Sequence, residues 1–145
     1  MSFLEKTFRC DCPVTSALDI VGDKWTLVII KLMLLDLKKT FKDFSKSDES
    51  IAPSILSTRL KTMVKIGLIV KVKQATNKKT NLYLLTQKGL SLTPIIDELA
   101  LWTHHNIQPI DPKKFNEMYG NIKDKKELHH AIIERYKVAM IPLKV

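Results

Sequence analysis

Residues 53–73, PSILSTRLKTMVKIGLIVKVK, place a helix-forming stretch directly before a strand-forming one. Pro53 suits the first turn of a helix and Gly67 the position just past its end, so the pattern predicts a helix that runs to Ile66. At about 100° per residue, one side of this helix carries Ser54, Ser57, Thr58, Lys61 and Lys65. The other side carries Ile55, Leu56, Leu60, Met63 and Ile66. The helix is therefore predicted to be amphipathic, with hydroxyl and lysine groups on its exposed face.

Side chains of these types contact base edges and phosphates, although the same pattern is also typical of an ordinary solvated helix. The segment after the helix favours the first interpretation. Residues 68–73 and 81–85 predict two strands, joined by a polar tip that carries Asn77, Lys78 and Lys79. A helix followed by a hairpin with a basic tip is typical of a winged helix-turn-helix, in which the helix enters the major groove and the wing touches phosphates or the minor groove.

The flanking sequence predicts further helices. They cover residues 13–21, behind Cys12-Pro13, residues 24–36, capped by Asp23, and a short basic segment 41–46, capped by Thr40. Thr86 caps a later helical stretch that Pro94 interrupts or restarts. The chain is turn-rich from Asn106, at Pro109, Asp111-Pro112 and Gly120, and a last helix covers 124–138. The predicted fold is mainly α with a small β-hairpin wing. It divides into a winged helix-turn-helix DNA-binding domain, 1–106, and a helical, dimer-supporting C-terminal extension, 107–145.

Positive charge is concentrated in the middle of the 145-residue chain. The whole chain has 24 Lys or Arg against 15 Asp or Glu, a formal net charge of +9. Residues 38–79 hold eleven of the cations and three of the acids, a net charge of +8. Excess positive charge favours a polyanionic partner, and charge spread over several elements favours one basic surface. This surface indicates nucleic acid rather than membrane, with Lys39, Lys42 and Lys65 as candidate phosphate contacts.

Composition and motifs exclude several classes of protein. Cys10 and Cys12 are too few for a disulfide scaffold, and the apolar stretch from Trp25 to Leu35 is shorter than the ~20 residues of a membrane span. With no secretory signal, a cytoplasmic protein is predicted. No phosphate loop, nucleophile elbow or carboxylate pair is found, so we expect no enzyme, catalytic residue or cofactor. Adjacent histidines, 104–105 and 129–130, diverge on a helix, which favours surface histidines over a metal site.

Several motifs resemble those of one protein family, and they follow one another in the same order as in that family. Cys12-Pro-Val14 and Ala17-Leu-Asp-Ile-Val-Gly-Asp-Lys-Trp25 resemble the CP…ALDxIGGKW signature of HxlR-type regulators, which are related to the MarR-like winged helices. Phe41-Lys-Asp-Phe44 resembles their RFxEL helix. The stretch Ile55-Leu-Ser-Thr-Arg-Leu-Lys61…Gly67-Leu-Ile69 resembles vLtxRLxxLxxxGLv, and Tyr83-Leu-Leu-Thr86…Gly89…Leu92-Thr-Pro94…Trp102 resembles YxLTxxGxxLxPvl…W. The matches cover residues 12–102.

This resemblance implies a bacterial, cytoplasmic homodimer whose first and last helices form the interface. It also implies that residues 54–61 enter the major groove of a pseudo-palindromic operator in double-stranded DNA, with half-sites about 34 Å apart. A competing interpretation is a winged-helix module that binds protein rather than DNA, and the +8 segment opposes it.

The chain departs from the family pattern at several positions. Asp23 replaces the second Gly, and Ala52 replaces the Ser that caps the recognition helix, so that this cap falls to Ser50 or to water. The wing has Lys71 and Lys73 in place of arginines, which removes bidentate phosphate contacts. Arg59, an arginine in the family too, lies about 140° from Ser54 on the helix, which favours an ion pair or a phosphate over base reading.

The cysteines have two interpretations. In several members of the family the cysteine of the CP pair senses oxidants or electrophiles. The N-terminus of a helix lowers a thiol pKa, which favours a reactive Cys12, whereas the adjacent Asp11 opposes it. An inert cysteine at the dimer interface is the alternative. Cys10 is a candidate resolving thiol, and because a bridge between residues two apart is strained, an intersubunit disulfide is the expected oxidised form.

Overall fold

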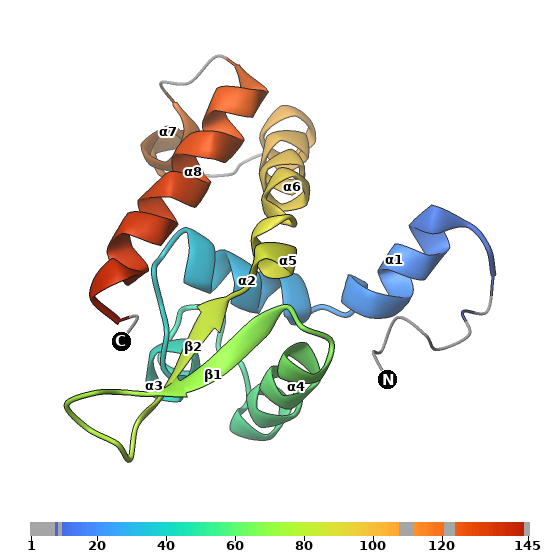
Figure 1. Ribbon diagram of the computed structural model, residues 1–145. Coiled ribbons are helices and arrows are strands. Elements are labelled where there is room, and N and C mark those ends of the chain that lie inside the picture. Colours follow the sequence, from blue (N-terminus) through green and yellow to red (C-terminus); the bar gives the residue numbers. More distant parts are fainter. Residues whose placement is uncertain (1–7, 9, 108–111, 121–123, 144–145) are drawn as a thin grey trace.

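The structure, a computed structural model, describes residues 8, 10–107, 112–120 and 124–143 (Figure 1). Its elements are α1 (Pro13–Val21), α2 (Thr26–Leu34), α3 (Phe41–Ser45), α4 (Pro53–Lys65), β1 (Ile69–Lys73), β2 (Asn81–Leu85), α5 (Gln87–Leu90), α6 (Thr93–Asn106), α7 (Pro112–Tyr119), α8 (Lys125–Met140) and a 3₁₀ turn (Ile141–Leu143). The predicted fold class, mainly α with a hairpin wing, is confirmed.

Helix boundaries follow the local signals. Pro53 starts α4 behind Ala52, and Gly67 follows its C-cap with a φ of 83°, a left-handed conformation that glycine adopts without strain. Thr40 forms a reciprocal capping box with Asp43, and the helical stretch after Thr86 restarts as α6 near Pro94. The last helix also begins as predicted, behind Asp124, but it continues to Met140.

The interpretation of Pro112 and Gly120 as turn signals is wrong, because the two residues delimit a helix, α7. Pro112 is its first residue, where a missing N–H costs nothing. Gly120 follows its last residue and donates its N–H to the carbonyl of Asn116 at 2.8 Å. Pro109 and Asp111, two further predicted turn residues, lie outside the described residues.

The core is arranged around α2, which contributes the fully buried Ile29, Ile30, Met33 and Leu34. At one end of the molecule lie α3, α4 and the hairpin, and at the other lie α6, α7 and the start of α8, while α1 projects to the side (Figure 1). Helix α8 runs back from there toward β2. The hairpin is antiparallel, and its register pairs Ile69 with Leu85 and Lys73 with Asn81.

The C-terminal helices share this core. Leu128, Ile132, Tyr136 and Met140 of α8 are buried in the same cluster as the apolar residues of α2, α4 and β2. The Tyr136 hydroxyl accepts the Leu85 N–H of β2 at 2.7 Å. The hydrophobic core therefore runs across the boundary expected at residue 106.

Candidate nucleic-acid interface

Helix α3 is fixed to both of its neighbours along the chain. The Asp43 carboxylate accepts the Lys39 and Thr40 N–H groups at 3.1 and 3.2 Å, while the Asp43 N–H donates to the Thr40 hydroxyl at 3.1 Å. Burial acts to raise the pKa of Asp43, but these hydrogen bonds outweigh it and lower that pKa. The Lys39 carbonyl in turn accepts the N–H of Tyr83 in β2 at 2.7 Å, so the start of α3 is attached to the wing.

Helix α4 presents its polar face outward at this end of the molecule. Ser54, Thr58, Lys61 and Lys65 are exposed and Ser57 is half-buried, whereas Leu56, Leu60 and Met63 are buried beneath. The Ala52 side chain makes no cap hydrogen bond, and the Ser50 hydroxyl lies 3.5 Å from the Asp48 carbonyl instead of capping the helix. Of the two expected caps, Ser50 or water, the structure contradicts Ser50.

One hydroxyl of the predicted face is already engaged. Thr58 donates its Oγ1–H to the Ser54 carbonyl at 2.9 Å. In this arrangement its oxygen can accept hydrogen bonds from a ligand, but its proton is held by the helix.

The placement of Ile55 on the apolar side is wrong, because its side chain is 38% exposed. It lies about 100° around the helix from Leu56, at the edge of the surface that the core covers. An exposed aliphatic group beside Ser54 is the kind of side chain that packs against a thymine methyl group. Nothing in the local sequence pattern indicates that Ile55 is exposed.

Arg59 forms the ion pair that its helical position favours. Its Nε lies 3.2 Å from Oδ2 of Asp23. The same carboxylate accepts the N–H groups of Trp25 and Thr26 at 3.1 and 3.0 Å, and the Thr26 hydroxyl at 2.5 Å. Burial acts to raise the pKa of Asp23, and these hydrogen bonds together with Arg59 lower it. The predicted cap is therefore not at Asp23, because Trp25 is the N-cap of α2, but the Asp that replaces a family glycine accepts the first N–H groups of α2 and ties this helix to α4.

The wing exposes its basic tip. Asn77, Lys78 and Lys79 are exposed, and the Asn77 side-chain oxygen accepts the Lys79 N–H at 3.1 Å. That contact shapes the turn. Lys71 and Lys73 are also exposed along β1.

The wing and α3 bring two of the predicted cations together. Lys42 and Lys79 line one surface hollow, together with Thr40, Phe41, Thr80, Asn81 and Tyr83. Lys39 is half-buried at the start of α3, and Lys65 is exposed at the far end of α4. The candidate contacts therefore lie on three elements at one end of the molecule (Figure 1).

The two cysteines lie away from this surface, before α1, and both are free and exposed. Cys12 occupies the N-cap position, although its sulfur makes no cap hydrogen bond of ordinary geometry. The N–H and hydroxyl of Thr15 and the N–H of Val14 still lower the pKa of the Cys12 thiol. The Cys12 N–H points to the Cys10 sulfur at 3.3 Å.

Two histidines differ from the expected surface histidines. His129 of α8 is paired through Nδ1 with Oδ2 of Asp97 at 2.5 Å, and Asp97 is fully buried on α6. His104 stacks on Phe115 of α7 with ring centres 3.8 Å apart. No group of three or more potential metal-ligating side chains gathers within the described ranges. Nor does any described helix have the length and apolar composition that crossing a bilayer requires.

Comparison with known proteins gives consistent matches. The model of the HxlR-like helix-turn-helix family matches residues 20–111. The HTH-type transcriptional regulator BH0655 of Halalkalibacterium halodurans is 33% identical over 92 residues, which cover 63% of this chain and 81% of that protein. The HTH-type transcriptional regulator YodB of Bacillus subtilis is 28% identical over 101 residues, covering 69% of this chain and 89% of that protein.

Comparison with solved structures agrees with these sequence matches. The redox regulator HypR in its oxidised form superposes with a TM-score of 0.59 at 28% identity, covering 68% of this chain and all of that chain. The reduced form of YodB superposes with a TM-score of 0.54 at 25% identity, covering 70% of this chain and all of that chain.

Proposed function

This chain belongs to the HxlR-like helix-turn-helix family of transcriptional regulators, and from that premise we propose that it binds a pseudo-palindromic operator as a cytoplasmic homodimer. In this proposal Ser54, Ser57, Thr58 and Lys61 of α4 contact base edges, and Asn77, Lys78 and Lys79 contact the backbone. Lys39, Lys42 and Lys65 contact phosphates. Arg59 positions α4 through Asp23 and is available to a phosphate. The proposed function requires no catalysis, metal or cofactor.

The observation that carries the proposal is the shared surface of α3, α4 and the wing. The exposed hydroxyl and lysine face of α4 lies at the same end of the molecule as the basic wing tip (Figure 1). Lys42 of α3 and Lys79 of the wing line one hollow, which suits a phosphate between two cations. An interaction module that recognises protein would not need this concentration of cations.

The proposed dimer uses apolar side chains that the monomer leaves uncovered. Val14 and Leu18 of α1 and Trp102 of α6 are more than half exposed, and Leu99 is half exposed. Helix α1 projects from the body of the molecule, where it can reach a second copy (Figure 1). Val138 and Ile141 near the end of α8 are exposed as well, which supports the proposed role of residues 107–145 in the dimer. Leu18→Asp is expected to yield a folded monomer in sedimentation, and a dimer that persists would contradict this interface.

The wing contacts are tested by Lys78→Ala combined with Lys79→Ala. DNA affinity is expected to fall equally for all sequences, and the slope of log affinity against log salt is expected to shrink by about one for each phosphate that the variant leaves unneutralised. Fluorescence anisotropy with a labelled duplex, over a series of salt concentrations, measures both. An unchanged slope would contradict the wing assignment.

A matched control removes two adjacent lysines from the other end of the molecule. Lys125→Ala combined with Lys126→Ala takes the same charge from the start of α8, where Lys125 pairs with Glu98 in an exposed ion pair. This variant is expected to keep the wild-type salt slope, because contact with phosphate, rather than net charge, sets the number of ions released.

Base reading by α4 is tested separately. Ser57→Ala and Thr58→Val are expected to change which sequences are selected from a random duplex library, whereas the wing variant leaves that selection unchanged. An unaltered selection for both α4 variants would place the base contacts elsewhere.

We further propose that Cys12 responds to oxidants. Its lowered pKa and exposure support a reactive thiol, and the similarity to a redox regulator is consistent with this role. Diamide is expected to oxidise Cys12 of one subunit and Cys10 of the other to a disulfide, with loss of two protons and two electrons to the diamide. A dimer on non-reducing gels and altered operator affinity are expected, both abolished in Cys12→Ser. Operator binding that diamide leaves unchanged would reduce Cys12 to a structural role.

A further inference from the structure

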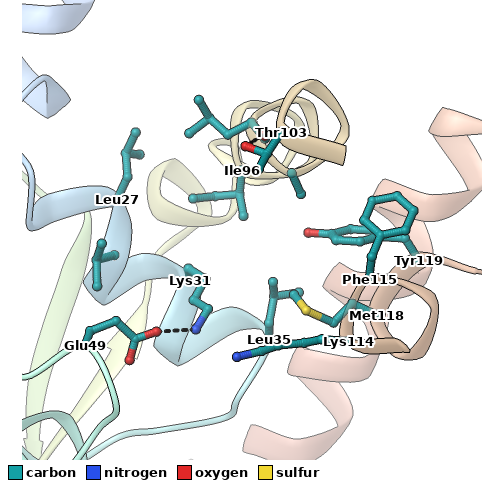
Figure 2. A pocket seen from close by; sticks show the side chains of 13 residues that line it. Leu27, Lys31, Leu35, Glu49, Ile96, Thr103, Lys114, Phe115, Met118 and Tyr119 are labelled. Carbon is teal, nitrogen blue, oxygen red and sulfur yellow. Dashed lines mark hydrogen bonds and ion pairs between the residues drawn. The ribbon is translucent and has the colours of Figure 1, made fainter. Parts of the chain in front are cut away.

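A largely apolar cavity of about 380 Å³ lies between α2, α6 and α7 (Figure 2). Aliphatic side chains line it on two sides, and α7 closes a third side with Phe115, Met118 and Tyr119. Helix α7 follows the residues matched by the family model, which end at 111. The cavity is thus built partly from residues beyond the helix-turn-helix region that the family shares. Its volume lies in the range of pockets that hold small molecules.

Charged groups gather at one edge of the cavity. Lys31 of α2 contacts Glu49 at 2.5 Å and Asp36 at 3.1 Å. Lys114 extends from α7 toward α2, and it makes no ion pair with any other described residue (Figure 2). The apolar cavity is therefore bordered by an ammonium group that has no carboxylate partner in the described part of the chain.

A second hollow, of about 510 Å³, continues from this edge. It shares Lys31, Leu35, Glu49 and Lys114 with the apolar cavity. Its lining adds further charged side chains, so that it holds five cations and three acids in all: Lys31, Lys38, Lys46, Lys114 and Arg135 against Asp36, Asp48 and Glu49. An apolar space thus opens into a polar one with an excess of positive charge, a combination that suits a molecule with an apolar body and an acidic group.

We propose that this composite cavity binds a small amphipathic anion, such as an aliphatic or aromatic carboxylate, with the apolar body among Phe115, Met118 and Ile96 and the acidic group at Lys114 and Lys31. A neutral apolar molecule would leave the Lys114 ammonium without a partner, whereas a carboxylate supplies one.

The position of Glu49 connects the cavity to the DNA-binding surface. Glu49 belongs to the segment between α3 and α4 and precedes the N-cap of α4 by three residues. Its contact with Lys31 is the ion pair that attaches this segment to α2. An incoming carboxylate competes with Glu49 for Lys31 and so releases the segment that positions the start of α4. Such a ligand acts as an effector that changes operator affinity, and this regulatory step rests on the proposed DNA binding.

Binding is tested without DNA, with octanoate and with 1-octanol as its uncharged counterpart. In protein labelled with ¹³C at the methionine methyl groups, Met118 reports on the cavity, and the buried Met33 and Met63 serve as internal references. Octanoate is expected to shift the Met118 resonance saturably, with 1-octanol binding several times more weakly. An unmoved Met118 resonance, or equal affinity for the two compounds, would overturn the proposal.

Two variants test the apolar part of the cavity and its charged edge separately. Ala100→Phe fills the cavity and is expected to abolish the Met118 shift, with thermal unfolding as the check on folding. Lys114→Gln is expected to weaken octanoate about two- to fivefold, the range of a solvent-accessible ion pair. Lys126→Gln, an exposed lysine outside the cavity lining, is the matched control and is expected to bind as wild type. If the Met118 resonance shifts with protein concentration and octanoate does not change it, the cavity is occupied by a second copy of the chain, and the proposal is overturned.

The regulatory step is measured on the operator selected from the random duplex library. Octanoate is expected to change operator affinity in the wild type and in Lys126→Gln but not in Ala100→Phe. Saturable binding at Met118 with unchanged operator affinity would overturn the effector role and leave DNA binding intact. A protein that binds octanoate but no duplex would overturn the proposed function and leave the cavity assignment standing.

Discussion

Helices α4 and α8 both bury an apolar side but use their polar residues in different ways. Both are amphipathic, with 13 and 16 residues, and both carry lysines on one side and apolar groups on the other. The front of α4 makes few contacts within the protein. Its one long-range polar contact is the ion pair of Arg59 with Asp23, among those the structure describes.

Helix α8, in contrast, makes several long-range polar contacts within the molecule. His129 is paired with the buried Asp97 of α6, the Tyr136 hydroxyl accepts an N–H from β2, and Arg135 donates to the Leu35 carbonyl at 2.9 Å. The difference shows that an amphipathic pattern alone does not indicate a binding surface. A helix is available to a ligand when its polar groups lack partners at long range, and that property is visible in the structure alone.

The largest effect expected from this comparison is on stability. Ile132→Ala removes a buried side chain from the inner face of α8 and is expected to lower the free energy of unfolding by about 2–5 kcal/mol. Ile55→Ala makes the same chemical change on the exposed edge of α4, where an effect within about 0.5 kcal/mol is expected. Urea unfolding followed by circular dichroism measures both. Equal losses would show that α4 is packed as tightly as α8.

A smaller loss of stability is expected when the hydroxyl group of Tyr136 is removed. Tyr136→Phe leaves the Leu85 N–H buried without its acceptor, which is expected to cost about 1–3 kcal/mol and to speed hydrogen exchange at that amide. Tyr83→Phe is the matched control, because the Tyr83 hydroxyl makes no hydrogen bond to the described residues. If both variants lose the same stability, the contact of α8 with the wing strand contributes nothing.

The smallest expected effect is a difference in how Asp97 of α6 and Asp43 of α3 make stability depend on pH. Burial raises the pKa of Asp97, against the opposing hydrogen bond from His129, so the folded protein holds a proton that the unfolded chain releases. Its contribution to stability is therefore present at low pH and is lost as the pH rises above the ordinary aspartate pKa of about 4.

Asp43 at the start of α3 has the opposite sign. Its pKa is lowered, so its contribution is present above a pH of about 4 and is lost as the pH falls through the lowered pKa. In urea unfolding over a pH series, Asp43→Asn is expected to flatten the loss of stability on the acid side. Asp97→Asn is expected to flatten the decline toward neutral pH. Identical profiles for the two variants would remove this distinction between the regions.

The part of the fold that local signals determine is predictable from the sequence. Pro53, Gly67 and Thr40 mark helix ends through effects that reach a few residues, and the structure has α4 and α3 at these positions. Periodicity misplaces Ile55 because it identifies an apolar side of the helix but not the width that the core covers. Helix α7 escapes prediction because proline and glycine are compatible both with turns and with helix ends.

The features with no local signal depend on residues that are distant in the sequence. Asp97 and His129 are 32 positions apart, and nothing around either residue indicates the other. The cavity likewise combines α2, α6 and α7, so neither its shape nor its charged edge follows from any one segment. For the candidate nucleic-acid interface, by contrast, the charge of residues 38–79 and the order of helix and hairpin already point to α3, α4 and the hairpin.

The hydrogen bond between Tyr136 and Leu85 also orders events during protein synthesis. The two residues are 51 positions apart, so the wing strand leaves the ribosome well before the group that satisfies its N–H. Until residue 136 has been translated, the nascent chain leaves the Leu85 N–H without the hydroxyl that accepts it and lacks the buried residues of α8 that complete the core. Such an intermediate is a substrate for chaperones and proteases, and a chain truncated between the wing and α8 is incomplete at the base of its wing.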